Sequence, residues 1–173
     1  MVSVKTKLAL IDAINTLIGV VGDKFDADED GDPERDFIAQ RCPKRLEGTV
    51  RGLPTLSMHL LGAIADGPMS LVGLAGKSGQ LKGTVSKHVQ RLVEAGLVVR
   101  APVPGNRKEI QLELTADGAL VSAAHREMHA EMDLGLREFL QRYSNADLKV
   151  LETVLRDLLA ARKEGVRIVA AES

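Results

Sequence analysis

The chain has 173 residues, of which 45% are apolar, 27% are charged and only 2% are aromatic. A formal net charge of −1 excludes a uniformly basic nucleic-acid coat, and a single cysteine excludes an internal disulfide framework. The sequence shows no secretory segment and no apolar run of membrane-spanning length, so we expect a cytoplasmic, mainly helical protein of one domain, with or without dimerising arms.

The N-terminal segment predicts an amphipathic helix over residues 3–21, because apolar side chains recur every three or four positions, at Leu8, Ile11, Ile14, Ile18 and Val21. An acidic segment follows, with eight acids and two bases between residues 23 and 36. It begins like a calcium loop, but Pro33 and Phe37 break that pattern. We expect a solvated linker.

Residues 36–45 predict one or two helical turns, broken at Pro43. The lone Cys42 lies here among Arg41, Lys44 and Arg45. It has either a structural role or, if those bases lower its pKa, a redox-sensing role.

The central segment predicts two helices, over residues 53–66 and 71–77, and then a turn at Gly79 and a third helix over residues 82–95. Strands over residues 97–103 and 109–115 come next, joined by a basic tip at residues 104–108. Helix, turn, helix and two-stranded ribbon together predict a winged helix-turn-helix, which reads DNA. We call residues 53–115 the reader domain.

The charge distribution supports DNA binding by this domain. Seven Lys or Arg and one acid lie between residues 77 and 108, where phosphate contacts would need them. The third helix would enter the major groove and the tip would reach a phosphate or the minor groove. The expected DNA-binding residues are Lys82, Gly83, Thr84, Ser86, Lys87, Gln90, Asn106, Arg107 and Lys108.

Two further helices are expected over residues 116–143 and 146–164, the first capped by Thr115, before a frayed tail. With the N-terminal helix they would form a dimerisation region. The expected division is therefore 1–52, 53–115 and 116–173. A two-fold homodimer places two readers roughly 34 Å apart, on double-stranded DNA with a pseudo-palindromic operator.

The sequence resembles the MarR family of bacterial transcriptional regulators in three stretches: LPTLSMHLLGAIADGPMSLVGLA, TVSKHVQRLVEAGLV and GNRKEIQLELTADG. The resemblance implies a winged helix core, a homodimer and a wing arginine, here Arg107. Two positions depart from the family pattern. Gly105 replaces an acidic residue before that arginine, and Leu81 replaces the serine that usually caps the recognition helix.

Two histidines, His125 and His129, lie four residues apart on one helix face and can share a metal ion. The sequence further resembles the zinc-sensing branch of the MarR family. This resemblance implies a zinc site made by Asp36, His59, His125 and His129, with zinc as the co-repressor of a repressor. That branch's second site is incomplete here, because Met58 and Ala124 replace carboxylates.

Two alternatives keep the regulator and change its effector: a small aromatic or phenolic ligand that releases DNA, or oxidation of Cys42. A metallohydrolase using the histidines would need a general base in an open cleft. No such constellation occurs in the sequence, so we do not expect an enzyme.

Overall fold

The computed structural model describes residues 6–26, 32–164 and 167–169. Its elements are α1 (Lys7–Asp26), α2 (Pro33–Arg41), α3 (Lys44–Gly52), α4 (Thr55–Ala65), α5 (Leu71–Ser78), α6 (Lys82–Glu94), β1 (Val98–Val103), β2 (Asn106–Leu114), α7 (Ala116–Leu140), α8 (Asn145–Ala160), β3 (Arg162–Glu164) and β4 (Arg167–Val169). The expected fold class is confirmed: a mainly helical chain with a small antiparallel wing.

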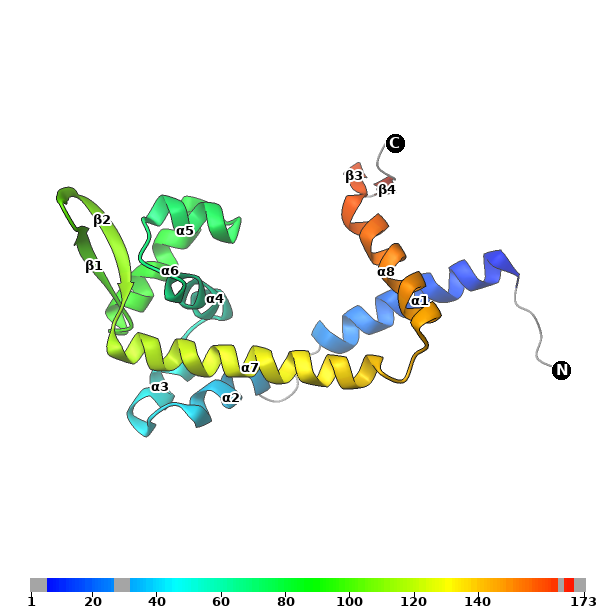
Figure 1. The fold of residues 1–173 in the computed structure, drawn as a ribbon, viewed down its shortest axis with the longest axis horizontal. Coiled ribbons are helices and arrows are strands. Elements are labelled where there is room, and N and C mark those ends of the chain that lie inside the picture. Colours follow the sequence, from blue (N-terminus) through cyan, green and yellow to red (C-terminus); the bar gives the residue numbers. More distant parts are fainter. Residues whose placement is uncertain (1–5, 27–31, 165–166, 170–173) are drawn as a thin grey trace.

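The long helix α7 runs from the foot of the wing to the connection with α8 (Figure 1). At one end lie α4, α5, α6 and the wing, with α2 and α3 against the first half of α7. At the other end lie α1 and α8. We call α1, residues 132–140 of α7, and α8 the arm. No helix in the described ranges is long and apolar enough to cross a membrane.

The reader domain is built on a shared apolar core. Buried leucines and valines from α4, α5, α6 and β1 meet there, including Leu60, Leu61, Leu74, Val85, Val89, Leu92 and Val98. Ser70 caps α5 by accepting a hydrogen bond from the Gly73 amide, and Gly79 ends it with a φ of +65°, a conformation that favours glycine. These two residues fix the tight turn that the sequence predicted before α6.

The wing is longer than expected. β1 and β2 pair antiparallel from Val98 opposite Leu114 to Val103 opposite Asn106, so the turn consists of Pro104 and Gly105. Residues 106–108, which we expected in the tip, belong to β2. Gly105 has a φ of +83°, and an acidic residue there would be strained. This explains one of the two departures from the family pattern.

The helix α3 was not predicted beyond residue 45. Leu46 and Val50 are its large apolar side chains, lie four residues apart on one face, and are both buried. Both join the core that includes Ile38 of α2 and the leucines of α4, so the core is continuous from α2 into the reader domain. Tertiary packing stabilises this short helix where local propensity does not.

The C-terminal segment also differs from expectation. The helix α7 ends at Leu140 and α8 ends at Ala160. Ser144 caps the start of α8 through a reciprocal capping box with Asp147. Part of the tail that we expected to be frayed forms β4, which pairs with β3 from Arg162 opposite Val169 to Glu164 opposite Arg167. In the acidic segment, α1 continues to Asp26 and residues 27–31 lie outside the described ranges.

Candidate metal site and nucleic-acid interface

Three histidines from two helices converge between the reader domain and α7. His59 comes from α4, and His125 and His129 come from successive turns of α7. One ring nitrogen from each lies within 4.8 Å of the other two. The Nε2 atoms of His125 and His129 are 3.2 Å apart. Three imidazoles at this spacing can bind one metal ion.

The surroundings of His125 favour its neutral imidazole. His125 is 5% exposed, and burial, followed by the charges of His129 and His59, lowers its pKa to about 4. A metal ligand must be deprotonated, so His125 is in the binding form at neutral pH. His59 and His129 are exposed.

Gly62 allows His125 to approach α4. A Cβ atom at position 62 would lie 3.3 Å from Nδ1 of His125 and 3.5 Å from its Cε1. Gly62 follows His59 by one helical turn, so both residues of α4 face the same ring. Sequence reasoning missed this glycine, although its spacing from His59 was available as a signal.

A cavity of about 10 Å³ adjoins the histidines, enough for one water-sized occupant. Its lining includes His59, His125, Asp32 and Glu34. Both carboxylate oxygens of Asp32 are engaged by Arg35: Oδ1 accepts from its backbone amide at 2.8 Å, and Oδ2 pairs with its guanidinium at 2.9 Å. The Glu34 side chain is exposed and lies beside the same cavity.

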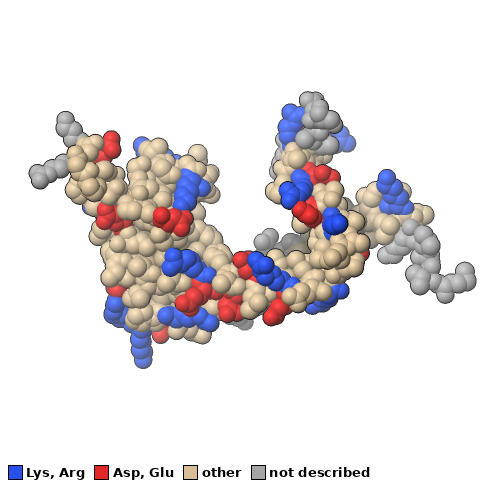
Figure 2. Space-filling view, in the orientation of Figure 1, with Lys and Arg blue, Asp and Glu red and all other residues tan. Residues whose placement is uncertain are grey.

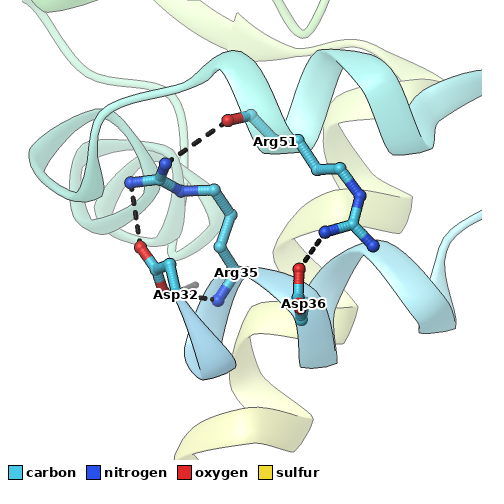
Figure 3. Close-up of polar contacts among 4 residues, drawn as sticks. All are labelled: Asp32, Arg35, Asp36 and Arg51. Carbon is cyan, nitrogen blue, oxygen red and sulfur yellow. Dashed lines mark hydrogen bonds and ion pairs between the residues drawn. The ribbon is translucent and has the colours of Figure 1, made fainter. Parts of the chain in front are cut away.

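Asp36, the expected fourth ligand, is not brought to the histidines. Its carboxylate pairs with the Arg51 guanidinium, and Arg35 donates to the Arg51 carbonyl at 3.3 Å (Figure 3). These contacts bind α2 to α3, the helix that the sequence analysis did not predict. The ion pair with Arg51 therefore directs the Asp36 carboxylate toward α3 and away from the histidines.

A hydrogen bond joins the helix of His59 to the recognition helix. Ser57 of α4 is fully buried, and its Oγ lies 2.8 Å from Nδ1 of His88 on α6. Burial, followed by the charges of Arg91 and Lys87, lowers the pKa of His88. Ser57 and His59 are two residues apart, so the histidine cluster and α6 are connected through one turn of α4.

The predicted DNA-binding residues of α6 fall into two groups. Lys82, Gly83 and Lys87 are exposed, and Thr84 and Ser86 are half-buried on the same helix. Gln90 instead holds the wing: its side chain accepts from Arg100 of β1 at 3.0 Å and donates to Glu94 at 2.9 Å. The first two turns of α6 are therefore the part available for base contacts.

Asn106 lies exposed at the start of β2. Arg107 and Lys108 follow it in the strand, and their side chains lie outside the described part of the chain.

The junction between the wing and α7 explains Thr115 and Gly118 at the end of the stretch GNRKEIQLELTADG. Thr115 caps α7 by accepting from the Gly118 amide at 2.9 Å. A Cβ atom at position 118 would lie 2.0 Å from the Leu97 carbonyl oxygen, so only glycine fits there. Arg45 of α3 forms a two-pronged pair with Asp117 on the same turn.

Cys42 lacks the setting of a redox sensor. It is 7% exposed, and burial, followed by the charge of Glu127, raises the pKa of its thiol. A reactive cysteine needs the opposite shift. Nearby Arg41 is engaged by the Phe37 ring and by Glu127 at 3.5 Å.

Comparison with known proteins gives a consistent result. The sequence model of the MarR family matches residues 51–109. The HTH-type transcriptional regulator YhjH of Bacillus subtilis, itself uncharacterized, is 27% identical over 65% of this chain and 65% of its own length. PchR of the same organism is 26% identical over 63% of this chain and 68% of its own length. The chain thus spans just under two thirds of YhjH.

Solved structures share the fold. A zinc-responsive MarR family member, ZitR of Lactococcus lactis, superposes with a TM-score of 0.66 at 17% identity, over 87% of this chain and 97% of ZitR. A ZitR variant in complex with DNA superposes with a TM-score of 0.67 at 16% identity, over 88% of this chain and 97% of the variant. The adhesin competence repressor AdcR of Streptococcus pyogenes superposes with a TM-score of 0.60 at 16% identity, over 85% of this chain and 93% of AdcR.

Proposed function

The chain belongs to the MarR family, whose members are transcriptional regulators and not enzymes, and from that premise we propose that it is a DNA-binding repressor whose affinity for DNA is raised by zinc. The observation that carries the proposal is the convergence of His59 with His125 and His129. DNA binding is supported by the exposed basic residues of α6 and by the ZitR variant solved with DNA.

The donor set fits zinc. Imidazole nitrogens are common zinc ligands, and three of them with one carboxylate make a closed four-coordinate site, which suits sensing rather than catalysis. The carboxylate would come from the start of α2: from Asp36, as the resemblance implies, or from Glu34, which already lines the cavity beside His59. Bound zinc supplies a positive centre that favours having all these donors close together.

The residues of the chain carry the response from the histidines to the DNA. His59 stands on α4 and the other two histidines stand on α7, so holding the three together fixes the reader domain against α7. Ser57 then fixes His88 and with it α6. Because α7 continues into the arm, the position of α6 becomes tied to the dimer axis.

A second copy of the chain is part of this proposal. The arm exposes a series of large apolar side chains, including Leu17 at 59%, Leu136 at 57% and Leu155 at 51%. Figure 2 shows a mostly uncharged surface where α7 meets α8, whereas charges of both signs mix along α7 nearer the reader domain. Pairing two arms would bury the apolar surface and place two readers on one operator.

The alternative effector, a small aromatic or phenolic acid, would bind in a different groove of the structure. A groove of about 440 Å³ between α4 and α5 is lined by His59, Gly62, Asp66 and Lys77 among others. Its cation, Lys77, is already paired with Asp66 at 2.6 Å and with the Ala63 carbonyl at 3.2 Å. The cavity beside the three histidines is too small for such a ligand.

Metal binding by the purified full-length chain tests the proposal. Titration against a fluorescent zinc chelator should give about one tight site per chain, which His59→Ala or His125→Ala removes. His88→Gln is the matched control, because His88 is the chain's remaining histidine and lies outside the cluster. Equal zinc affinity in all four proteins would contradict the proposal.

The fourth ligand is resolved by two conservative changes. If Glu34 completes the site, Glu34→Gln should weaken zinc binding by about 10- to 100-fold and Asp36→Asn should not. If Asp36 leaves Arg51 to bind the ion, the order reverses. The absorption of the cobalt-substituted protein reports the change in the ligand set independently of affinity.

A further inference from the structure

Leu81 stands at the start of the recognition helix with its side chain in solvent. It is the N-cap residue of α6, and it is 80% exposed, more than any other large apolar side chain of the reader domain. Its backbone carbonyl accepts the first helical hydrogen bond, from Val85 at 3.0 Å. The backbone therefore has a structural role at this position, whereas the side chain packs on nothing in the core.

A leucine here costs stability. Serine, threonine, aspartate and asparagine are preferred at N-caps because their oxygen accepts from an amide of the first turn, and leucine cannot. Ser70, Thr115 and Ser144 make this bond for α5, α7 and α8, whereas α6 has no side-chain cap. An exposed apolar residue that also forgoes a cap is expected where binding, not folding, decides the residue.

The surroundings of Leu81 are those of a base-reading position. Lys82 and Lys87 beside it are exposed and suited to phosphates, and Gly83 has no atom within 4 Å of the place a Cβ would occupy. Nothing on the first turn therefore shields the Leu81 side chain from a groove into which the helix N-terminus is inserted.

The bases offer one apolar partner in the major groove, the C5-methyl group of thymine. We propose that Leu81 is a specificity-determining residue that selects a thymine in each half-site by contacting this methyl group. The inference rests on the proposed DNA-binding function and adds the chemical group that is read.

Uracil provides the test, because replacing thymine by uracil removes the methyl group and leaves the base pair unchanged. The operator is first obtained by selecting random duplexes with the full-length chain, with and without added zinc. Each thymine of the selected site is then replaced in turn and binding is measured by fluorescence anisotropy. One replacement per half-site should weaken wild-type binding by about fourfold, as expected for one buried methyl group.

Leu81→Ala should abolish that sensitivity, reducing the factor to about 1.5-fold or less, while general DNA binding persists. Leu81→Ser should do the same and also raise the unfolding temperature by a few degrees, because serine restores the cap. Val72→Ala is the matched control. Val72 is an exposed apolar residue at 62% on α5, outside the first turn of α6, and its replacement should leave the uracil effect intact.

Two results would overturn the inference and are distinguishable. If the wild-type chain selects DNA but every uracil replacement affects it and Leu81→Ala by the same factor, Leu81 does not read thymine. If the wild-type chain selects no DNA at all, the proposed function fails and this inference fails with it.

Discussion

The reader domain and the arm differ in where their apolar side chains point. In the reader domain, Leu60, Leu74, Val89 and their neighbours are fully buried within one chain. In the arm, α8 has no buried residue, and α1 exposes Leu8 at 68% and Ile18 at 60%. Amphipathic helices therefore bury their apolar side chains within one chain in the reader domain, and expose them to solvent in the arm. The apolar face of the arm is the surface for which we propose a second copy of the chain as the partner.

The candidate metal site lies where these two regions meet. His59 belongs to the reader domain, whereas His125 and His129 belong to the helix that continues into the arm. A ligand bound there can couple the position of one region to the other, which a site inside either region could not do.

Gly118→Ala should produce the largest effect, confined to the stability of the reader domain. The new Cβ would meet the Leu97 carbonyl oxygen at 2.0 Å, and neither backbone can move away cheaply. We expect a loss of about 3 kcal/mol or more in urea unfolding. Gly48→Ala, whose Cβ meets nothing within 4 Å, should be neutral or stabilising by up to about 1 kcal/mol. Equal stability of the two variants would contradict the account.

Leu155→Glu should break the arm without unfolding the reader domain. A charge placed in the apolar face of α8 should raise the dimer dissociation constant by roughly 100-fold, measured by sedimentation, while the helical circular dichroism of the reader is retained. Leu120→Glu is the control, because Leu120 is 44% exposed on the first half of α7, outside the arm. A monomeric wild-type chain, or an unchanged dimer in Leu155→Glu, would contradict the proposed pairing.

Ser57→Ala should cost about 1–2 kcal/mol, because it removes the partner of His88 Nδ1 in a buried setting. Ser122→Ala provides a matched comparison: Ser122 is 1% exposed, and its hydroxyl has no hydrogen-bond partner within the described residues. That change should be neutral or stabilising. Chemical denaturation measures the free energy of unfolding of both variants. A larger loss of this free energy in Ser122→Ala than in Ser57→Ala would refute the assigned role of the Ser57 hydrogen bond.

The smallest expected effect is on the titration of His88. Burial, then Arg91 and Lys87, lower its pKa, so the folded state favours the neutral ring. This contribution to stability is fully present above the unfolded pKa of about 6.5 and is lost as the pH falls below it. Arg91→Gln should raise the pKa of His88 in NMR titrations, because one repelling charge is removed. A pKa that stays or falls would show that the charge of Arg91 does not lower the pKa of His88.

Most of the fold could be predicted from local sequence patterns. The reader helices carry regular apolar spacing, and caps such as Ser70 and Thr115 mark their starts. The helix α3 could not be predicted, because Leu46 and Val50 acquire their significance only by packing on distant residues. The pairing of β3 with β4 was missed for the same reason, since each strand has only three residues.

The candidate site was predictable in part. Spacing placed His125 and His129 on one face, and the resemblance added His59, which the structure brings to them. The ion pair of Asp36 with Arg51 could not be foreseen, because Arg51 lies on the unpredicted α3, and Asp36 as a ligand stays a prediction. Gly62 and the bond from Ser57 to His88 depend on how α4 packs against α7 and α6, which no local pattern reveals.

The most direct test of the account is a DNA-binding titration of the full-length chain on its selected operator, with zinc and then with a chelator. We predict that zinc raises affinity by at least about tenfold, a coupling of roughly 1.4 kcal/mol, and that the variant carrying His125→Ala and His129→Ala binds as the chelated wild-type protein does. Identical affinities of the wild-type protein with zinc and with chelator would contradict the central claim that the histidine cluster controls the reader domain.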